Sequence, residues 1–263
     1  MCRRRVDLVI PQEDVCRREP SSRGMTHAAG PPSVVGMTTN QPTTTTSLFL
    51  LVLKDDGRPE SMGQQTGYGL AGALLSDLVA AGRLGVSDDG KKLRVLDAGP
   101  TGDDLLDEGL RRFGDKDGKR LSSVIPGAAR KLEREVGDYL ARRGVVRVEE
   151  GGMLGLKPQR YPIVDTSREA ELRRGLVEVL RGASPTVEQH ALIGLVHGLE
   201  LGTKVFDHEE VGLDKGDLKR RIKAVAESAG PGADGVARAV QSANTAMITA
   251  ITVATVSSTS GSS

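Results

Sequence analysis

The sequence contains few aromatic residues: Phe, Tyr and Trp make up 2% of its 263 residues, and Trp is absent. The core must therefore be built from Leu, Val, Ile and Ala, which pack closely in helices when they recur at helical intervals. Apolar residues make up 38% of the chain, enough for a core that needs no disulfide or metal. We therefore expect an all-α fold.

Cysteine is also scarce. The two cysteines, Cys2 and Cys16, both lie in the N-terminal segment. This placement excludes a Cys-ligated zinc site, a disulfide within the core and a cysteine nucleophile. It also favours a reducing, cytoplasmic compartment.

Long hydrophobic runs and a charge excess are both missing. Leu48–Leu53 and Ala246–Val256 are far shorter than the roughly 20 apolar residues that span a bilayer. Any membrane association should therefore be peripheral, on the cytoplasmic face. With 36 basic and 35 acidic residues, the chain has no global field that attracts nucleic acid or anionic lipid. Electrostatic binding must be local.

The composition suggests three segments. Residues 1–46, rich in Pro, Ser, Gly and Thr, are typical of a disordered extension, and they lack the apolar run of a signal peptide. Met37 is an alternative translation start within this extension. We expect a single helical domain over residues 47–256 and a disordered tail over residues 257–263.

Helical spacing predicts two units in which a hairpin follows a helix. Apolar residues from Tyr68 onward predict a helix that Gly82 ends. The turn Ser87–Gly90 then predicts a β-hairpin. We therefore expect a helical bundle with two short hairpins at its edges.

The second unit repeats this order. The apolar stripe Ala129–Leu140 predicts a helix ended by Gly144. Val145–Val148 and Met153–Leu156 are the expected strands of the second hairpin.

The remaining helices are predicted from their caps. Thr101 is expected to cap a helix that continues to Phe113, and Thr166 with Glu169 forms a capping-box pattern. Ser184-Pro185 marks a further helix start. The last helix, Asp234–Val256, is apolar on nearly every side and should lie inside the bundle.

One motif identifies a family. Residues Ala98–Leu110 read Ala-Gly-Pro-Thr-Gly-Asp-Asp-Leu-Leu-Asp-Glu-Gly-Leu. This run resembles the Pro-Thr-Gly-Asp and Leu-Leu-Asp-Glu signature of the Golgi phosphoprotein 3 family, here in a bacterial-type form. Leu48–Asp55, Gly69–Gly72 and Gly82–Leu84 support the resemblance.

The resemblance implies a function. Eukaryotic members bind phosphatidylinositol 4-phosphate on Golgi membranes and tether glycosyltransferases, and the family hairpin mediates self-association. For this chain it implies a non-enzymatic, cofactor-free adaptor on a membrane surface. Its expected partners are anionic phospholipid headgroups, cargo proteins and further copies of itself.

The resemblance also implies a headgroup pocket made by a Trp, an Arg and two basic residues. These positions fall on Met62, Ala71, Arg130 and Glu133. Only Arg130 matches the family pattern, and Glu133 would repel a phosphate.

Two neighbouring cations offer a replacement. Arg134 lies one helical turn from Arg130, and the two could clamp a phosphate, with Lys131 at the edge. Alternatively, these side chains form a solvated face paired with Glu133, Glu135 and other acids of the helix.

Other functions remain open at this stage. A helix followed by a hairpin is also typical of a winged-helix protein that binds nucleic acid, and a protein-only interaction module is a further alternative. Carboxylates Asp103, Asp104, Asp107 and Glu108 resemble an acid-base cluster, but acids also stabilise the first turn of a helix. No phosphate-binding glycine loop, nucleophile elbow or metal-ligand spacing favours an enzyme.

Overall fold

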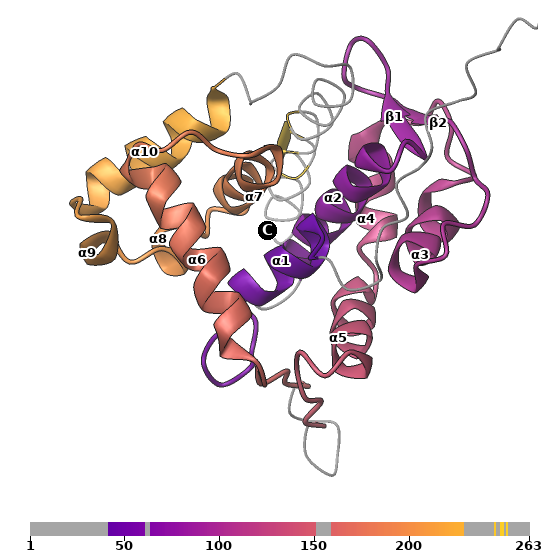
Figure 1. Cartoon of the computed structure of the whole chain (residues 1–263). Helices are drawn as coiled ribbons and strands as arrows, with labels where there is room; N and C mark the ends of the chain where they lie inside the picture. The colour runs from indigo at the N-terminus through magenta and orange to yellow at the C-terminus, as the bar shows by residue number, and fades with distance from the viewer. Residues whose placement is uncertain are drawn as a thin grey trace, which may run out of the picture. The chain divides into compact units, whose positions relative to one another are not determined.

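The computed structural model describes residues 42–60, 64–150 and 159–228, with positions 245, 248, 249 and 251. Residues 1–38, which include Met37, and the tail 257–263 lie outside the described residues, and the described residues belong to a second unit, Thr39–Ser263. In its described part, the second unit holds ten helices and one two-stranded antiparallel sheet (Figure 1). The predicted all-α class is confirmed.

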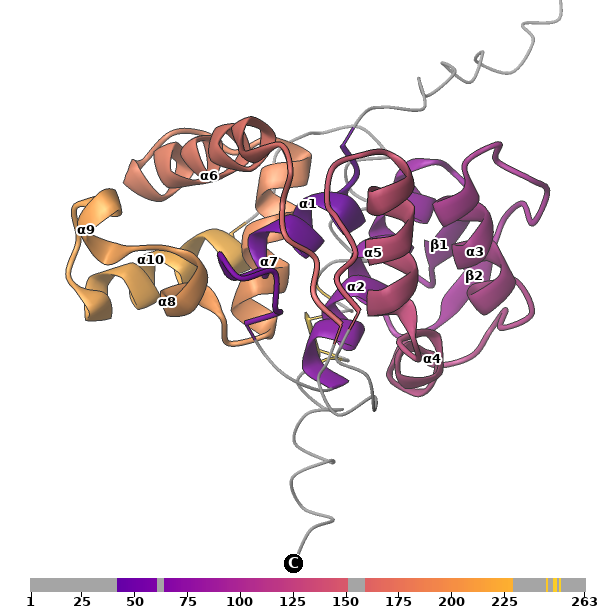
Figure 2. The same ribbon diagram turned by 90° about the horizontal axis from the view of Figure 1, so that it is seen from below.

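The elements follow one another in this order: α1 (Thr44–Leu51), α2 (Gln64–Ala80), β1 (Leu84–Val86), β2 (Leu93–Val95), α3 (Asp104–Phe113), α4 (Leu121–Ala128), α5 (Leu132–Arg142), α6 (Thr166–Arg181), α7 (Val187–Gly198), α8 (Gly202–Val205), α9 (His208–Val211) and α10 (Lys215–Glu227). Helices α1 and α2 lie between β1, β2 and α3–α5 on one side and α6–α10 on the other, as Figure 2 also shows from below.

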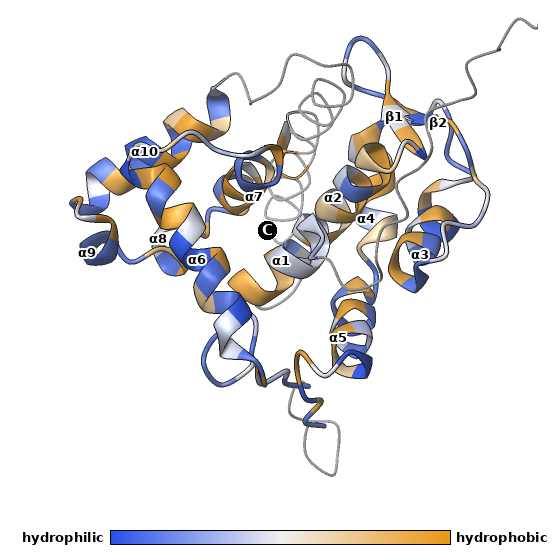
Figure 3. Cartoon of the chain, viewed as in Figure 1, coloured by the Kyte–Doolittle hydropathy of each residue, from blue (hydrophilic) through white to orange (hydrophobic). Residues whose placement is uncertain are grey.

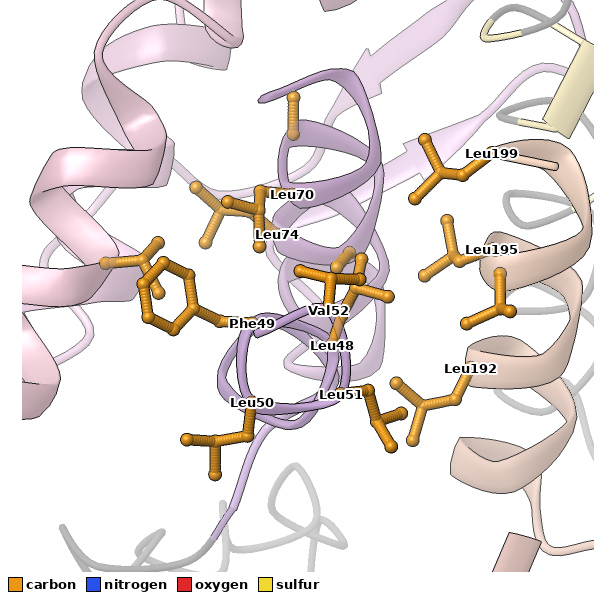
Figure 4. Close-up of a cluster of buried hydrophobic side chains, with 14 of the residues drawn as sticks. Leu48, Phe49, Leu50, Leu51, Val52, Leu70, Leu74, Leu192, Leu195 and Leu199 are labelled. Atoms are coloured by element: carbon orange, nitrogen blue, oxygen red, sulfur yellow. The ribbon is translucent and has the colours of Figure 1, made fainter. Parts of the chain in front are cut away.

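Helix α1 is buried along its whole length and contacts α2, α5, α6 and α7. Figure 4 shows Leu48 and Leu51 of α1 on the side of Leu192 and Leu195 of α7, whereas Phe49 points to the opposite side of α1. Burying one such side chain contributes about 1.5–3 kcal/mol. This cluster therefore stabilises the fold far more than the exposed ion pairs do.

The threonine run before Leu48 belongs to α1, so the predicted disordered extension over residues 1–46 is wrong for Thr44–Thr46. Thr43 is the N-cap, and its hydroxyl and that of Thr46 each accept the other residue's backbone N–H in a capping box. Thr44 to Ser47 are all buried. Threonine is a good cap but a weak helix former, so tertiary packing decides this segment.

Asp77 of α2 completes the cap of α1. Its carboxylate accepts the backbone N–H groups of Thr44 at 2.8 Å and Thr45 at 2.9 Å, and the Thr45 hydroxyl at 2.6 Å. Helix α1 has no acidic residue in its own first turn. Burial raises the pKa of Asp77, and the three donors oppose that shift. Asp77 therefore ties α2 to the start of α1.

The first hairpin is confirmed. Strands β1 and β2 pair antiparallel with Leu84 opposite Val95. The turn closes through a 2.7 Å hydrogen bond from Gly90 N–H to the Ser87 carbonyl, and Gly90 has the positive φ of 68° that favours glycine.

The second hairpin has a different register from the prediction. Its first limb forms antiparallel bridges from Val146 to Ile163 and from Glu149 to Arg160. The expected partner strand, Met153–Leu156, lies outside the described residues. The connection is therefore longer than the four residues expected between the two strands.

Three N-caps lie one or two residues from their predicted positions. Asp103 rather than Thr101 caps α3, Asp165 rather than Thr166 caps α6, and Thr186 rather than Ser184 caps α7. Each pair offers two short oxygen-bearing side chains that can both cap a helix, so local sequence does not distinguish them. Gly82 and Gly144, which were expected to end α2 and α5, both have a positive φ. Helix α4, which contains Pro126, was not predicted.

The C-terminal helices are amphipathic, and both hydropathy colours occur along α6 and α10 in Figure 3. The last predicted helix, Asp234–Val256, lies mostly outside the described residues, although Ile251 is buried and Thr249 is exposed. Among the helices that the structure describes, none combines the length and apolarity needed to cross a bilayer.

Candidate anion-binding site

The motif Ala98–Leu110 folds on itself. The Thr101 backbone N–H and hydroxyl both donate to Asp107 Oδ1 at 2.7 Å. Asp103 Oδ1 caps α3 by accepting the N–H groups of Leu105 at 2.9 Å and Leu106 at 3.1 Å. These bonds satisfy backbone donors that the start of a helix leaves unpaired.

The same carboxylate joins α3 to α5. Asp103 Oδ2 accepts the Tyr139 hydroxyl at 2.7 Å and lies 3.4 Å from Arg143 Nη2. The Arg143 guanidinium also stacks 3.8 Å from the centre of the Tyr139 ring. Asp103 and Asp107 of the motif therefore have structural partners.

Replacing Asp103 with alanine is expected to lower the free energy of unfolding by about 2–3 kcal/mol, because both the cap and the tyrosine bond are lost. Asp103→Asn, which keeps the cap acceptor, should cost about half as much. Urea unfolding measures both. The matched control is Asp104→Asn, since Asp104 is exposed and lies 3.9 Å from Arg142; an equal loss in the control would contradict the assignment.

A groove of about 340 Å³ lies between α3 and α5. Five carboxylates line it against two arginines: Asp104, Asp107, Glu108, Glu135 and Asp138 against Arg111 and Arg142. Hydrogen bonds from Thr101 lower the pKa of Asp107. Burial acts to raise the pKa of Glu108, but Arg111 and Arg112 hold it below its ordinary value. Both are therefore poor general acids, and the acidic groove disfavours phosphate.

The predicted cations lie at the corner between α4 and α5, which we call the 128–131 corner. Helix α4 ends at Ala128, and Lys131 precedes α5 with a left-handed φ of 59°. Arg130 and Lys131 are exposed, and among the described residues neither has an ion-pair partner within 4.0 Å. Two adjacent cations are thus available to an anion.

The sequence predicts Arg130 and Arg134 on one continuous helix, and this prediction is wrong. The left-handed Lys131 interrupts the path, so helical i, i+4 spacing does not relate the two arginines. Arg134 is exposed and pairs with Asp138 at 3.7 Å, the type of contact that the solvated-face alternative predicted. Glu133 has no ion pair within the described residues, and burial raises its pKa.

The profile of the Golgi phosphoprotein 3 (GPP34) family matches residues 46–246, which is more than half of the chain. The chain belongs to the Golgi phosphoprotein 3 family.

A curated member of similar sequence is vacuolar protein sorting-associated protein 74 from Eremothecium gossypii. It is 28% identical over 212 residues, which cover 68% of this chain and 63% of that protein. The chain therefore spans less than two thirds of the length of the relative that it matches.

The position that the resemblance assigns to a pocket arginine is filled here by Ala71, which is fully buried in α2. Met62, at the tryptophan position, lies outside the described residues. The first turn of α2 nevertheless approaches the 128–131 corner, because a Cβ on Gly67 would lie 3.0 Å from the Ala129 carbonyl oxygen. This Golgi phosphoprotein 3 chain thus presents two adjacent cations, Arg130 and Lys131, beside the start of α2.

The other basic runs have structural roles or lie elsewhere. Arg173 donates to the carbonyls of Val205 and Leu51, and Arg221 donates to those of Leu180 and Val179. Both therefore cap helix C-termini. Helix α10, which carries Lys219–Lys223, contacts α6–α9 rather than α5.

The winged-helix alternative does not fit α2 and the hairpin that follows it. Helix α2 is buried from Thr66 to Val79, so it cannot enter a nucleic-acid groove. The histidines also agree with a structural role: His190 is buried, with Nε2 3.3 Å from the Ser228 carbonyl oxygen. Over the part of the chain that the structure describes, no three His, Cys, Asp or Glu residues gather to hold a metal.

Proposed function

We propose that this chain is a non-enzymatic peripheral adaptor of a cytoplasmic membrane surface that binds a phosphate-bearing lipid headgroup at the 128–131 corner. Arg130 and Lys131 make the primary contacts, and Arg134 contributes from the first turn of α5. Family membership supports lipid binding at this level, and phosphatidylinositol 4-phosphate is the headgroup known for eukaryotic members.

The observation that carries the proposal is the pair of exposed cations without ion-pair partners among the described residues. Charge-assisted hydrogen bonds from Arg and Lys to phosphate are stronger than neutral ones. Helix α2, whose first turn contacts Ala129, has no acidic residue in that turn, so its positive end adds to the attraction.

Glu133 sets a limit on the site. It stands where the family has a basic residue, on the first turn of α5 and two residues after Lys131. Its carboxylate opposes the cations, so the expected affinity is lower than that of a pocket with four favourable contacts.

Vesicle co-sedimentation of the full chain tests the proposal. Neutral, phosphatidylserine and phosphatidylinositol 4-phosphate vesicles should be compared at several salt concentrations, since salt screens exposed charges. Pelleting should be strongest with the phosphoinositide. Arg130→Ala with Lys131→Ala should weaken it about tenfold or more, the loss expected when at least 1.4 kcal/mol of charged contacts is removed.

Two variants sharpen the test. Lys219→Ala with Lys223→Ala removes the same charge from α10 and should leave pelleting within about twofold of the parent, because it touches no proposed contact. Glu133→Lys should strengthen pelleting. No pelleting with any vesicle would contradict the lipid proposal and favour an adaptor that binds only proteins.

A further inference from the structure

The side chain of Arg112 connects three elements beside the proposed site. It extends from the end of α3 and is 12% exposed. Its Nε donates to Glu108 of the same helix at 2.6 Å, and its Nη2 pairs with Glu135 of α5. The guanidinium plane is therefore fixed from two sides.

The remaining contacts of Arg112 are to the 128–131 corner itself. Its Nη1 donates to the Ala128 carbonyl at 2.5 Å and to the Arg130 carbonyl at 2.9 Å. Ala128 is the last residue of α4, so Arg112 supplies a donor to a helix end that lacks one. The second bond fixes the backbone of Arg130, the residue whose side chain is proposed to contact the anion.

The hydrogen bonds of the corner lengthen after Ala129. Ala129 N–H donates to the Ile125 carbonyl at 2.9 Å, whereas Arg130 N–H reaches the Gly127 carbonyl only at 3.4 Å and Leu132 N–H reaches the Ala129 carbonyl at 3.2 Å. Amide hydrogen bonds are commonly about 2.7–3.2 Å long, so the Arg130 bond is weak and the Leu132 bond is at the long end of the range. Lys131 also has a left-handed backbone, which side-chain-bearing residues adopt only where their surroundings impose it.

From this geometry we infer that Arg112 is the positioning residue of the anion site: it holds the 128–131 corner in the conformation that presents Arg130 and Lys131 together. The inference rests on the proposed function, and it assigns specificity to a side chain that does not touch the lipid. A flexible corner would still attract anionic surfaces, whereas a fixed one favours a phosphate of defined position.

Arg112→Lys and Arg112→Gln test this role in the full chain. Lysine keeps the positive charge, but its single ammonium cannot replace the three guanidinium nitrogens that contact Glu108, Glu135 and the two carbonyls of the corner at the same time. We expect Arg112→Lys to weaken binding to phosphatidylinositol 4-phosphate vesicles about fivefold to tenfold, and Arg112→Gln at least as much. Binding to phosphatidylserine vesicles should change less than twofold.

The matched control is Arg111→Gln. Arg111 is the preceding residue, is 67% exposed and pairs only with Glu108 among the described residues. This variant should bind both vesicles as the parent does. In the Arg130→Ala, Lys131→Ala background, Arg112→Lys should cause no further loss, because it acts through those two residues.

Amide hydrogen exchange separates positioning from general loss of stability. Residues 129–132 should exchange faster in both Arg112 variants but not in Arg111→Gln, while α1 and α7 keep parental protection. Unchanged exchange at the corner would overturn the inference, as would an additive binding loss. If the parent itself binds no vesicle, the proposed lipid function fails, and the exchange data alone still decide whether Arg112 fixes the corner.

Discussion

Gly137→Ala is expected to lower the free energy of unfolding by about 3 kcal/mol or more, the largest loss from any single methyl group discussed for this chain. A Cβ on Gly137 would lie 2.2 Å from Cε1 and 2.4 Å from Cζ of Tyr161. Atoms at such distances overlap, so the ring or α5 must move. The usual gain of about 1 kcal/mol from replacing a helical glycine with alanine is too small to offset the overlap.

Tyr161 has little room to move. It is 1% exposed, and its ring packs edge-on against Phe49 of α1 at 5.3 Å between centroids. Its backbone N–H donates to the Gly57 carbonyl at 2.8 Å. Displacing Tyr161 would therefore also disturb α1, which carries Phe49.

Urea unfolding of Gly127→Ala provides the control for this prediction. Gly127 is helical and exposed, and a Cβ there meets nothing within 4 Å. That variant should match the parent or gain up to about 1 kcal/mol. Equal stability of the two alanine variants would show that the contact between α5 and Tyr161 is looser than described.

Asp77→Asn is expected to cost about 2–4 kcal/mol. Both carboxylate oxygens accept buried donors, one from Thr44 and two from Thr45. Asparagine has only one side-chain oxygen, so its amide N–H would face a buried N–H donor and leave it unpaired. The favourable charge at the start of α1 would also be lost.

Thr45→Val separates the contributions of the individual bonds. It removes the hydroxyl but keeps the backbone N–H that donates to Asp77, so about 1 kcal/mol is expected. Chemical unfolding of the two variants at pH 7 is the measurement. If Asp77→Asn costs no more than Thr45→Val, the two backbone bonds contribute little to holding α1.

Local sequence predicted the elements whose signals lie close together in the chain. The apolar stripes and glycine stops located α2 and the helix ended by Gly144, and a four-residue turn located the first hairpin. The Pro-Thr-Gly-Asp motif identified the family from a single stretch. It did so through residues that hold α3 and α5 together, Asp103 above all, rather than through ligand contacts.

The features that the sequence did not predict depend on contacts between residues that lie far apart along the chain. Asp77 caps a helix 33 residues earlier, and Arg112 bonds a carbonyl 18 residues later. Neither has a local pattern. The 128–131 corner was hidden because Lys131 adopts a backbone conformation that lysine rarely takes, and the apolar stripe from Ala129 continues through it as though the helix were unbroken.

The central place of α1 has a consequence for folding during synthesis. Its apolar side chains are covered partly by α7, which begins 136 residues after α1 ends, from Leu51 to Val187. At about 5–20 residues per second, a ribosome needs on the order of ten seconds to make that stretch. Throughout this interval Leu48–Leu53 lacks its final cover, so the nascent chain carries an aggregation-prone segment that a chaperone is well suited to shield.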